Sequence, residues 1–129
     1  MKRIFIVFSV FLIFAACSID SSSVATEHVS DSSAYKLFQT TNMWTFIKLD
    51  TRNGRIWQVQ FDINGENRMQ TVLNAESLTG GDVSNAAERF MLYPTQNMYT
   101  FMLLDQTDGR TWQVQWNFDE QYRLIVPIL

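Results

Sequence analysis

The sequence predicts an all-β protein built from two tandem antiparallel β-meander repeats. Residues 35–68 align with residues 90–123 at a constant offset of 55, and 15 of the 34 aligned pairs are identical. Within each copy, short aromatic and β-branched runs alternate with turn-forming residues, which indicates about four strands per repeat. Two such meanders are expected to pack as a small sandwich or partly closed barrel. Alternatively, each repeat is a propeller-like blade, whose two copies close a ring only by oligomerising.

Residues 1–16 are predicted to be a signal peptide rather than part of this fold. Lys2 and Arg3 give a basic start, an apolar run extends from Ile4 to Phe14, and two alanines precede Cys17. The run has about 11 residues, whereas a permanent membrane-spanning helix needs about 20. The segment is therefore expected to be removed on export.

Phe14-Ala15-Ala16-Cys17 resembles the lipobox of bacterial lipoproteins, in which the cysteine is acylated and becomes the new N-terminus. The resemblance implies a lipid on Cys17 that anchors the protein to a membrane of the cell envelope. In two-membrane bacteria, an aspartate directly after this cysteine favours retention in the inner membrane. Because Ser18 stands there, the resemblance implies the outer membrane, with the periplasmic or surface face left open.

Composition divides the exported chain into a tether and one domain. Residues 17–33 contain seven serines and little to bury, so they are predicted to be a flexible lipidated tether. Residues 34–129 are expected to form a single β domain with repeat 1 at 35–74, a linker at 75–89 and repeat 2 at 90–129. Cys17 is the only cysteine, so the domain has no internal disulfide.

The charge of the exported chain favours some partners over others. Removal of residues 1–16 takes away Lys2 and Arg3 and leaves eight Lys and Arg against 13 Asp and Glu, a net charge of −5. This balance argues against nucleic acid as a partner, because phosphate-backbone binding relies on clustered Lys and Arg. It suits a basic protein partner through electrostatic steering.

The first and last predicted strands of repeat 2 each carry a proline. First strands are predicted at residues 35–41 and 90–96, and Pro94 places the second of these at a sheet edge because proline has no N–H for the ladder. The final run, residues 124–129, is apolar on both faces and is predicted to lie between other elements. Pro127 within it indicates that one side is not fully paired.

The linker between the repeats changes character. Gly80 and Gly81 are expected to break the chain. Asp82 then stands where it can cap a short helix through residues 84–89. The linker is therefore predicted to be partly helical.

The strongest hairpin signal is an Asn-Gly pair in repeat 1 and an Asp-Gly pair at the same place in repeat 2. A two-residue loop places Arg52 opposite Arg55, whereas a four-residue loop places Asp50 opposite Arg55. Opposite charges favour the four-residue loop, with its glycine in the left-handed conformation. The predicted turn residues are Asp50, Gly54 and Arg55 in repeat 1, and Asp105, Gly109 and Arg110 in repeat 2.

Strand alternation gives each repeat two faces, and the aromatic face is predicted to be the core face in both repeats. The two aromatic faces are expected to pack together about a pseudo-twofold axis. The predicted core face carries Trp44, Phe46, Trp57, Val59 and Phe61 in repeat 1, and Tyr99, Phe101, Leu103, Trp112, Val114 and Trp116 in repeat 2. The opposite face carries Thr45, Ile47, Leu49, Ile56, Gln58 and Gln60, matched by Thr100, Met102, Leu104, Thr111, Gln113 and Gln115.

The sequence offers little for catalysis, so the protein is predicted not to be an enzyme and to need no cofactor. His28 is the only histidine and lies in the tether, which leaves no pair of histidine or cysteine ligands for a transition metal. No Gly-rich loop precedes a helix to hold phosphate. The repeated Asp50 and Asp105 are interpreted as turn residues that accept backbone N–H bonds, rather than as an acid–base pair.

Two groups of residues are candidates for binding. Four glutamines at equivalent positions of the two repeats, Gln58, Gln60, Gln113 and Gln115, form a predicted amide-lined surface, although a solvated face inherited by duplication explains them as well. Trp44 and Tyr99 stand at strand starts and are the aromatic side chains expected to be most open to a sugar.

The segments 49–57 and 104–112 are similar to an LDT-x-x-G-x-x-W hairpin found in many small exported bacterial proteins, most of them uncharacterised. The resemblance implies the hairpin and no particular activity. The first hypothesis is a lipid-anchored binding module that recognises an envelope or secreted protein, in an immunity or inhibitor role. The alternatives are a glycan-binding lipoprotein that uses exposed Trp and Tyr, and a structural subunit of an envelope complex.

Overall fold

The computed structural model describes residues 33–82 and 86–129. The predicted signal peptide, Cys17, His28 and most of the predicted tether lie outside the described residues. In the described part of the chain, no helix has the length and hydropathy needed to cross a membrane.

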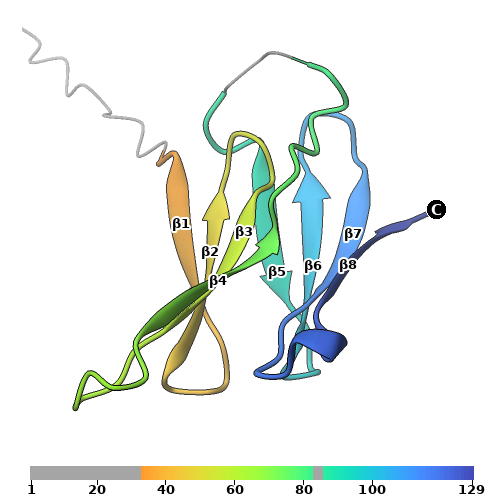
Figure 1. Ribbon diagram of the computed structural model, residues 1–129. Coiled ribbons are helices and arrows are strands. Elements are labelled where there is room, and N and C mark those ends of the chain that lie inside the picture. Colours follow the sequence, from red (N-terminus) through yellow and green to blue (C-terminus); the bar gives the residue numbers. More distant parts are fainter. Residues whose placement is uncertain (1–32, 83–85) are drawn as a thin grey trace, which may run out of the picture.

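Two four-stranded antiparallel sheets make up the domain, one from each repeat, with the strands of each sheet adjacent in chain order (Figure 1). The prediction of an all-β fold with two meanders is confirmed, and the sheets pack as a sandwich. Sheet 1 contains β1 (Tyr35–Gln39), β2 (Thr45–Asp50), β3 (Ile56–Gln60) and β4 (Met69–Asn74). Sheet 2 contains β5 (Phe90–Pro94), β6 (Thr100–Asp105), β7 (Thr111–Gln115) and β8 (Leu124–Ile128), with a 3-10 turn, η1 (Glu120–Tyr122), before β8.

The central hairpins have the predicted four-residue loops. The Asp50 N–H donates to the Arg55 carbonyl at 2.9 Å, and the Asp105 N–H donates to the Arg110 carbonyl at 2.9 Å. Gly54 has φ +78°, a left-handed conformation that carries little penalty only for glycine. The predicted register is therefore observed and turn chemistry accounts for it, whereas the side chain of Asp50 pairs with Arg52 instead of the expected Arg55.

One expectation about the outer parts of the fold needs correction. The run 124–129 does not lie between other elements: β8 is an edge strand, with Val126 and Ile128 exposed. Pro94 lies on β5, the other edge of sheet 2, as predicted. Both edge strands of sheet 2 therefore contain a proline.

The linker is not helical in the residues that the structure describes. Residues 86–89 form a turn in which Glu88 adopts a positive φ of 67°, a conformation that does not propagate a right-handed helix. Asp82, the predicted cap, accepts a hydrogen bond from Nη1 of Arg89 at 2.7 Å. Residues 84 and 85, the start of the predicted helix, lie outside the described residues.

The two repeats bury opposite faces. In sheet 2 the aromatic face forms the core, as predicted, through Phe101, Leu103, Trp112, Val114 and Trp116. In sheet 1 the predicted core face is wrong: Ile47, Leu49 and Ile56 are fully buried, together with Thr45 and Gln58, whereas Phe46, Trp57 and Phe61 lie on the outside.

The reason lies in a few substitutions between the repeats. Lys48 of repeat 1 occupies the position of the fully buried Leu103 of repeat 2, and an unpaired buried ammonium is costly. On the other face, repeat 1 has Ile47 and Ile56 where repeat 2 has Met102 and Thr111. Sheet 1 therefore buries more aliphatic surface and no charge by turning its aliphatic face inward.

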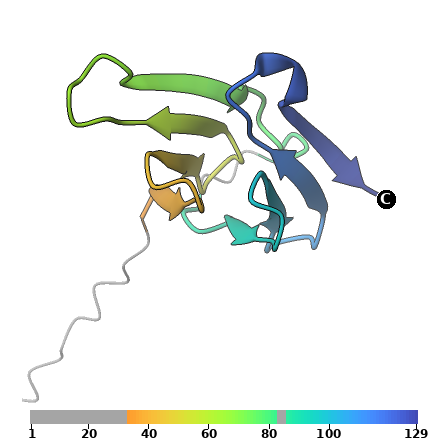
Figure 2. The same ribbon diagram turned by 90° about the horizontal axis from the view of Figure 1, so that it is seen from below.

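The sandwich is consequently directional rather than pseudo-twofold. The aromatic face of sheet 2 packs on the aliphatic face of sheet 1, so the sheets are stacked front to back (Figure 2). Phe38, Leu73, Leu78, Tyr99 and Ile125 extend this core at its margins. Each sheet keeps its other face uncovered by the rest of the described chain.

Candidate functional site

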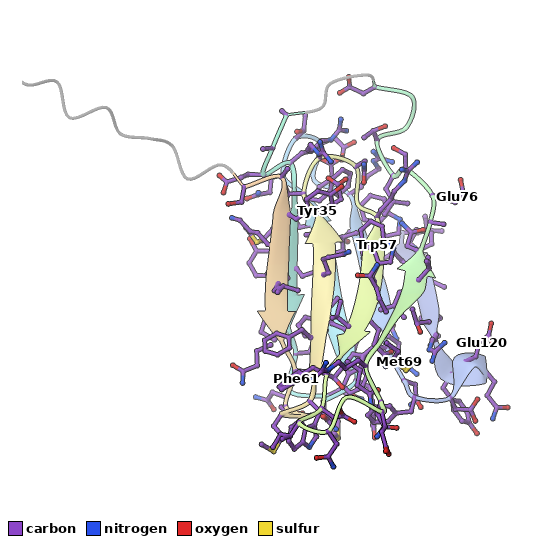
Figure 3. All side chains as sticks on the ribbon, turned by 60° about the vertical axis from the view of Figure 1, so that its left-hand side comes forward. Tyr35, Trp57, Phe61, Met69, Glu76 and Glu120 are labelled. Atoms are coloured by element: carbon purple, nitrogen blue, oxygen red, sulfur yellow. The ribbon has the colours of Figure 1, made fainter. Side chains whose placement is uncertain are left out.

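The most distinctive surfaces of the molecule are the two uncovered sheet faces. Figure 3 looks onto sheet 1, with sheet 2 behind it, and labels Tyr35, Trp57 and Phe61 on this side. The outer face of sheet 1 consists of Tyr35, Leu37, Phe46, Lys48, Trp57, Val59, Phe61 and Val72. The outer face of sheet 2 consists of Met91, Tyr93, Met102, Leu104, Thr111, Gln113, Gln115, Leu124, Val126 and Ile128.

Both faces expose large apolar side chains. Leu37 is 62% exposed and Val72 is 51% exposed on sheet 1, and Ile128 is 49% exposed on sheet 2. Soluble monomers rarely expose contiguous apolar patches of more than a few hundred Å², and such patches mark interaction sites. These two faces are therefore the candidate functional surfaces.

A cation occupies the middle of the outer face of sheet 1. The Lys48 Nζ lies 4.5 Å from the ring centroid of Trp57 and 5.9 Å from that of Tyr35, and it donates to Gln70 Oε1 at 2.7 Å. This cation–π geometry covers the ring of Trp57 with an ammonium group. The Trp57 ring is thereby less open to a flat stacking partner.

A second contact between a cation and an aromatic ring lies at the edge of this face. The guanidinium carbon of Arg52 is 5.2 Å from the Tyr35 ring centroid, and Arg52 Nη2 donates to the Tyr35 hydroxyl at 3.1 Å. The outer face of sheet 1 thus combines an apolar surface with two cations that rest on aromatic rings. Such a mixture of aromatic and arginine side chains is enriched at protein interfaces.

The two predicted aromatic binding residues are not brought together. Trp44 is half-buried and packs edge-on against Phe61, with ring centroids 5.4 Å apart. Tyr99 is half-buried on the other sheet, 5.2 Å from the ring centroid of Trp116, where it borders the core. Each ring packs on a neighbour within its own repeat, so they form no joint platform.

The four glutamines do not form one surface either. Gln58 is fully buried between the sheets, and neither polar atom of its side chain has a hydrogen-bond partner among the described residues. Gln60 is half-buried, with its Oε1 in the same situation. Only Gln113 and Gln115 lie on an outer face, where Gln115 Nε2 donates to the Tyr122 carbonyl at 2.8 Å. The predicted amide-lined surface is split by the front-to-back packing.

Asp50 has the structural role that its place in the turn predicts, although its arginine is Arg52 rather than Arg55. Arg52 donates from Nε and from Nη2 to the two carboxylate oxygens, each at 2.9 Å, and its backbone N–H adds a third bond at 3.1 Å. Burial alone raises the pKa of the Asp50 carboxyl, but the hydrogen bonds and charge of Arg52 outweigh it and lower the pKa. A carboxylate held in its ionised form by a turn is unsuited to general acid catalysis.

Asp105, the equivalent of Asp50, pairs mainly with Arg89. It is fully buried and receives hydrogen bonds from Arg89 Nε at 3.1 and 3.0 Å and from Arg89 Nη2 at 2.8 Å. Arg110, the predicted partner, contributes a longer contact of 3.3 Å. The hydrogen bonds to Asp105, opposed by burial, raise the pKa of Arg89. Sequence reasoning missed Arg89 because its equivalent in repeat 1 is Ala34, so the duplication gave no signal.

The described residues form neither a metal site nor a well-formed ligand pocket. Within the described ranges, no group of three or more His, Cys, Asp or Glu side chains is placed to hold a metal ion. A pocket of about 200 Å³ opens between the β1–β2 and β5–β6 loops, beside Thr40, Thr95 and Asn97. The hydroxyls of Thr40 and Thr95 already donate to the carbonyls of Thr45 and Thr100, and the pocket is smaller than the range typical of ligand sites.

The resemblances to the lipoprotein lipobox and to the exported-protein hairpin rest on short motifs and remain predictions. The fold itself is defined by the duplication and by the face that each repeat buries. No family model matches this sequence, and neither a curated protein nor a solved structure matches it.

Proposed function

We propose that this chain is a non-catalytic, lipid-anchored binding module of the bacterial cell envelope that recognises protein through the outer faces of its two sheets. The observation that carries the proposal is the presence of two uncovered apolar sheet faces on opposite sides of one small domain. Leaving Leu37, Val72 and Ile128 in water is unfavourable unless a partner removes them from it.

The composition of these faces supports a protein partner. Aromatic residues, methionine and arginine are enriched in protein interfaces, and the two faces carry Tyr35, Trp57, Met91 and Met102, with Arg52 at the border. Among the strand residues of the two faces, the acidic side chain is Asp50, at the end of β2 opposite Tyr35, and it is buried and paired with Arg52. The apolar faces therefore carry no unpaired negative charge on their described strands.

The envelope part of the proposal rests on the sequence. The lipobox-like residues before Cys17 and the serine-rich tether support a lipid anchor, with the outer membrane favoured by Ser18. A partner is then an envelope protein or a secreted protein that reaches the membrane surface. An immunity or inhibitor role is one form of such recognition.

A glycan-binding role is the second candidate, and it is favoured by Tyr35. This ring is 52% exposed and lies beside the Arg52 guanidinium, a combination that also suits a sugar. Titration of the exported chain with envelope glycans, followed by tryptophan fluorescence, tests it through Trp57, 6.4 Å from the Tyr35 ring. A saturable shift that Tyr35→Ala abolishes would favour the glycan role over protein recognition.

Protein recognition is tested by capture from solubilised envelope and from secreted material, with the exported chain as bait. The test variant is Leu37→Glu/Val72→Glu, which places charge at two exposed positions of the outer face of sheet 1. The matched control is Ile63→Glu, because Ile63 is 80% exposed in the β3–β4 turn and lies off both faces. Stoichiometric capture that survives in the control and is lost in the test variant is expected. Equal capture by both variants would exclude the sheet 1 face as the binding surface.

A further inference from the structure

The interface between the two sheets joins two different faces of the duplicated repeat. Its halves are not equivalent, because sheet 1 contributes its aliphatic face and sheet 2 its aromatic face. A shift by 55 residues maps the buried face of sheet 2 onto the outer face of sheet 1, and the buried face of sheet 1 onto the outer face of sheet 2. Each chain therefore presents one uncovered copy of each half of its own core interface.

We propose that the partner of these faces is a second copy of this chain, stacked head to tail so that the outer face of sheet 2 of one copy packs on the outer face of sheet 1 of the next. The inference rests on the proposed function and names its partner. It follows from continuity with an interface that already exists inside the chain, rather than from the apolar character of the faces alone.

The residues that would form the intermolecular contact keep the character of the core. Ten apolar side chains form the buried cluster between the sheets. Their equivalents at the proposed contact are apolar or aromatic at all but two positions, Lys48 and Thr111. On sheet 1 the equivalents are Tyr35, Leu37, Phe46, Lys48, Trp57, Val59 and Phe61, and on sheet 2 they are Met102, Leu104 and Thr111.

The margins of the interface are also repeated. Phe38 and Leu73, which extend the core on sheet 1, correspond to Tyr93 and Ile128 on the outer face of sheet 2. Both equivalents are exposed in the single chain. The exposure of β8, which the sequence alone did not predict, is accounted for if the next copy covers it.

The backbone at the seam supports the same stacking. The Phe90 N–H, on the free edge of β5, donates to the Thr51 carbonyl of the other sheet at 2.8 Å. The equivalent atoms are the Tyr35 N–H, on the free edge of β1, and the Gln106 carbonyl. Head-to-tail stacking would bring these two groups together across two copies.

Two differences make the proposed contact weaker than the internal one. Lys48 replaces the buried Leu103, so its ammonium must be accommodated between copies. The ion pair between Lys36 and Glu88, 2.6 Å long and bridging the two repeats, becomes Met91 and Ser33. The contact between copies is therefore expected to be weaker than the contact between the two sheets of one chain.

An interface made of two different faces joins copies into a closed ring or an open filament. Stacked four-stranded sheets close into rings of about four to eight sheets in β-propellers. At two sheets per chain, this corresponds to about two to four copies. A closed ring covers every apolar face, so a ring of this size is the expected assembly.

The experiment uses the exported chain, residues 17–129, with Cys17→Ser so that no lipid is attached. Native mass spectrometry and analytical ultracentrifugation are expected to show one discrete assembly of two to four copies, with larger species absent. Lys48→Leu, which restores the residue found at Leu103, is expected to lower the dissociation constant by about tenfold or more. A strictly monomeric chain at micromolar concentration would overturn the proposal.

Two face variants distinguish head-to-tail stacking from a twofold dimer. Leu37→Glu/Val72→Glu alters only the outer face of sheet 1, and Tyr93→Glu/Val126→Glu alters only that of sheet 2. Each variant alone is expected to be monomeric, and an equimolar mixture is expected to give a one-to-one heterodimer through the two unaltered faces. Self-association of either variant alone, or a mixture that stays monomeric where the unaltered chain assembles, would contradict the proposal. Near-ultraviolet circular dichroism of the buried Trp112 and Trp116 verifies folding in each case.

These outcomes separate the inference from the proposed function. Capture of another protein by a monomeric chain would refute self-stacking and leave protein recognition standing. Neither assembly nor capture would refute both. A ring that captures nothing would support self-stacking as the recognition that the faces perform.

Discussion

Repeat 1 and repeat 2 share 15 of 34 aligned residues and the same strand order, yet they bury opposite faces. The aromatic residues are nearly the same in both, so aromatic content did not decide which face turned inward. The decisive positions are few, above all Lys48 against Leu103. A duplicated sheet with two apolar faces takes its orientation from its neighbour, and small substitutions bias the choice.

The hairpin turns of the two repeats also differ, in the arginine that pairs with the buried aspartate. Asp50 and Asp105 are equivalent and both are buried, but the first is paired by Arg52 inside its own turn and the second by Arg89 from the linker. Repeat 1 is thus locally self-sufficient at this turn. Repeat 2 depends on a residue that lies outside the hairpin, and its turn is tied to the connection between the repeats.

Removal of equivalent tryptophans should give the largest difference between the repeats. Trp112→Ala empties a nearly buried site in the core and is expected to lower the free energy of unfolding by about 3–5 kcal/mol. Trp57→Ala removes a half-buried ring from an outer face and is expected to cost much less in the monomeric state. Urea denaturation at low protein concentration measures both. Equal losses would mean that the two faces are equally buried.

The arginines offer the next comparison. Arg89→Ala leaves the fully buried Asp105 with the Thr107 N–H and the longer contact from Arg110, and is expected to cost about 3 kcal/mol. Arg52→Ala is expected to have a smaller effect, because Arg52 is partly exposed and water can replace it. Thermal denaturation of both variants beside Arg89→Lys provides the measurement. A larger loss from Arg52→Ala would reverse the inferred dependence of repeat 2 on its linker.

Equivalent glutamine substitutions test the inverted face through an expected gain in stability. Gln58→Leu replaces a buried amide that has no partner among the described residues, and is expected to raise the free energy of unfolding by about 1 kcal/mol. The equivalent Gln113→Leu lies on the outer face of sheet 2 and is expected to leave monomer stability within about 0.5 kcal/mol. Chemical denaturation of the two variants measures both changes in the free energy of unfolding. Destabilisation by Gln58→Leu would show that its amide is solvated or bonded between the sheets.

The smallest expected effect is on the pH dependence of stability. Because the pKa of the Asp50 carboxyl is lowered in the folded state, its contribution is present above its unfolded pKa of about 3.9 and is lost as the pH falls through the folded value. Asp50→Asn should lower stability at neutral pH and flatten the decline below about pH 4. Asp108 of repeat 2, which corresponds to Asn53, has a carboxyl pKa that is also lowered by its hydrogen bonds to Arg110, so Asp108→Asn provides a comparison in the other hairpin turn. An unchanged slope for Asp50→Asn would argue against the Arg52 pair as its cause.

Local rules predicted much of this fold. Alternation and turn chemistry gave the strands, the meanders and the hairpin register, because each depends on neighbours in the chain. They did not identify the buried face of sheet 1, since alternation separates two apolar faces without ranking them. They also missed the Arg89–Asp105 pair, which joins residues 16 positions apart, and the positive φ of Glu88 in the segment predicted to be helical.

The candidate site was predicted less well than the fold. Its residues were chosen as polar or aromatic side chains that faced solvent, and the inversion moved Gln58 inward and Trp57 outward. Burial between sheets is a property of the assembled pair, so no single repeat encodes it. The exposed face of each sheet is the face whose equivalent is buried in the other sheet.

The two edge prolines bear on a different hazard, which is amyloid-like growth. Pro94 on β5 and Pro127 on β8 each remove a backbone donor from an edge strand of sheet 2, and Lys36 places a charge on the free edge of β1. Strand-by-strand extension of the kind that builds cross-β fibrils is therefore interrupted at three of the four edges of the domain. The domain therefore exposes apolar sheet faces that favour association, while its edge strands disfavour the addition of further strands.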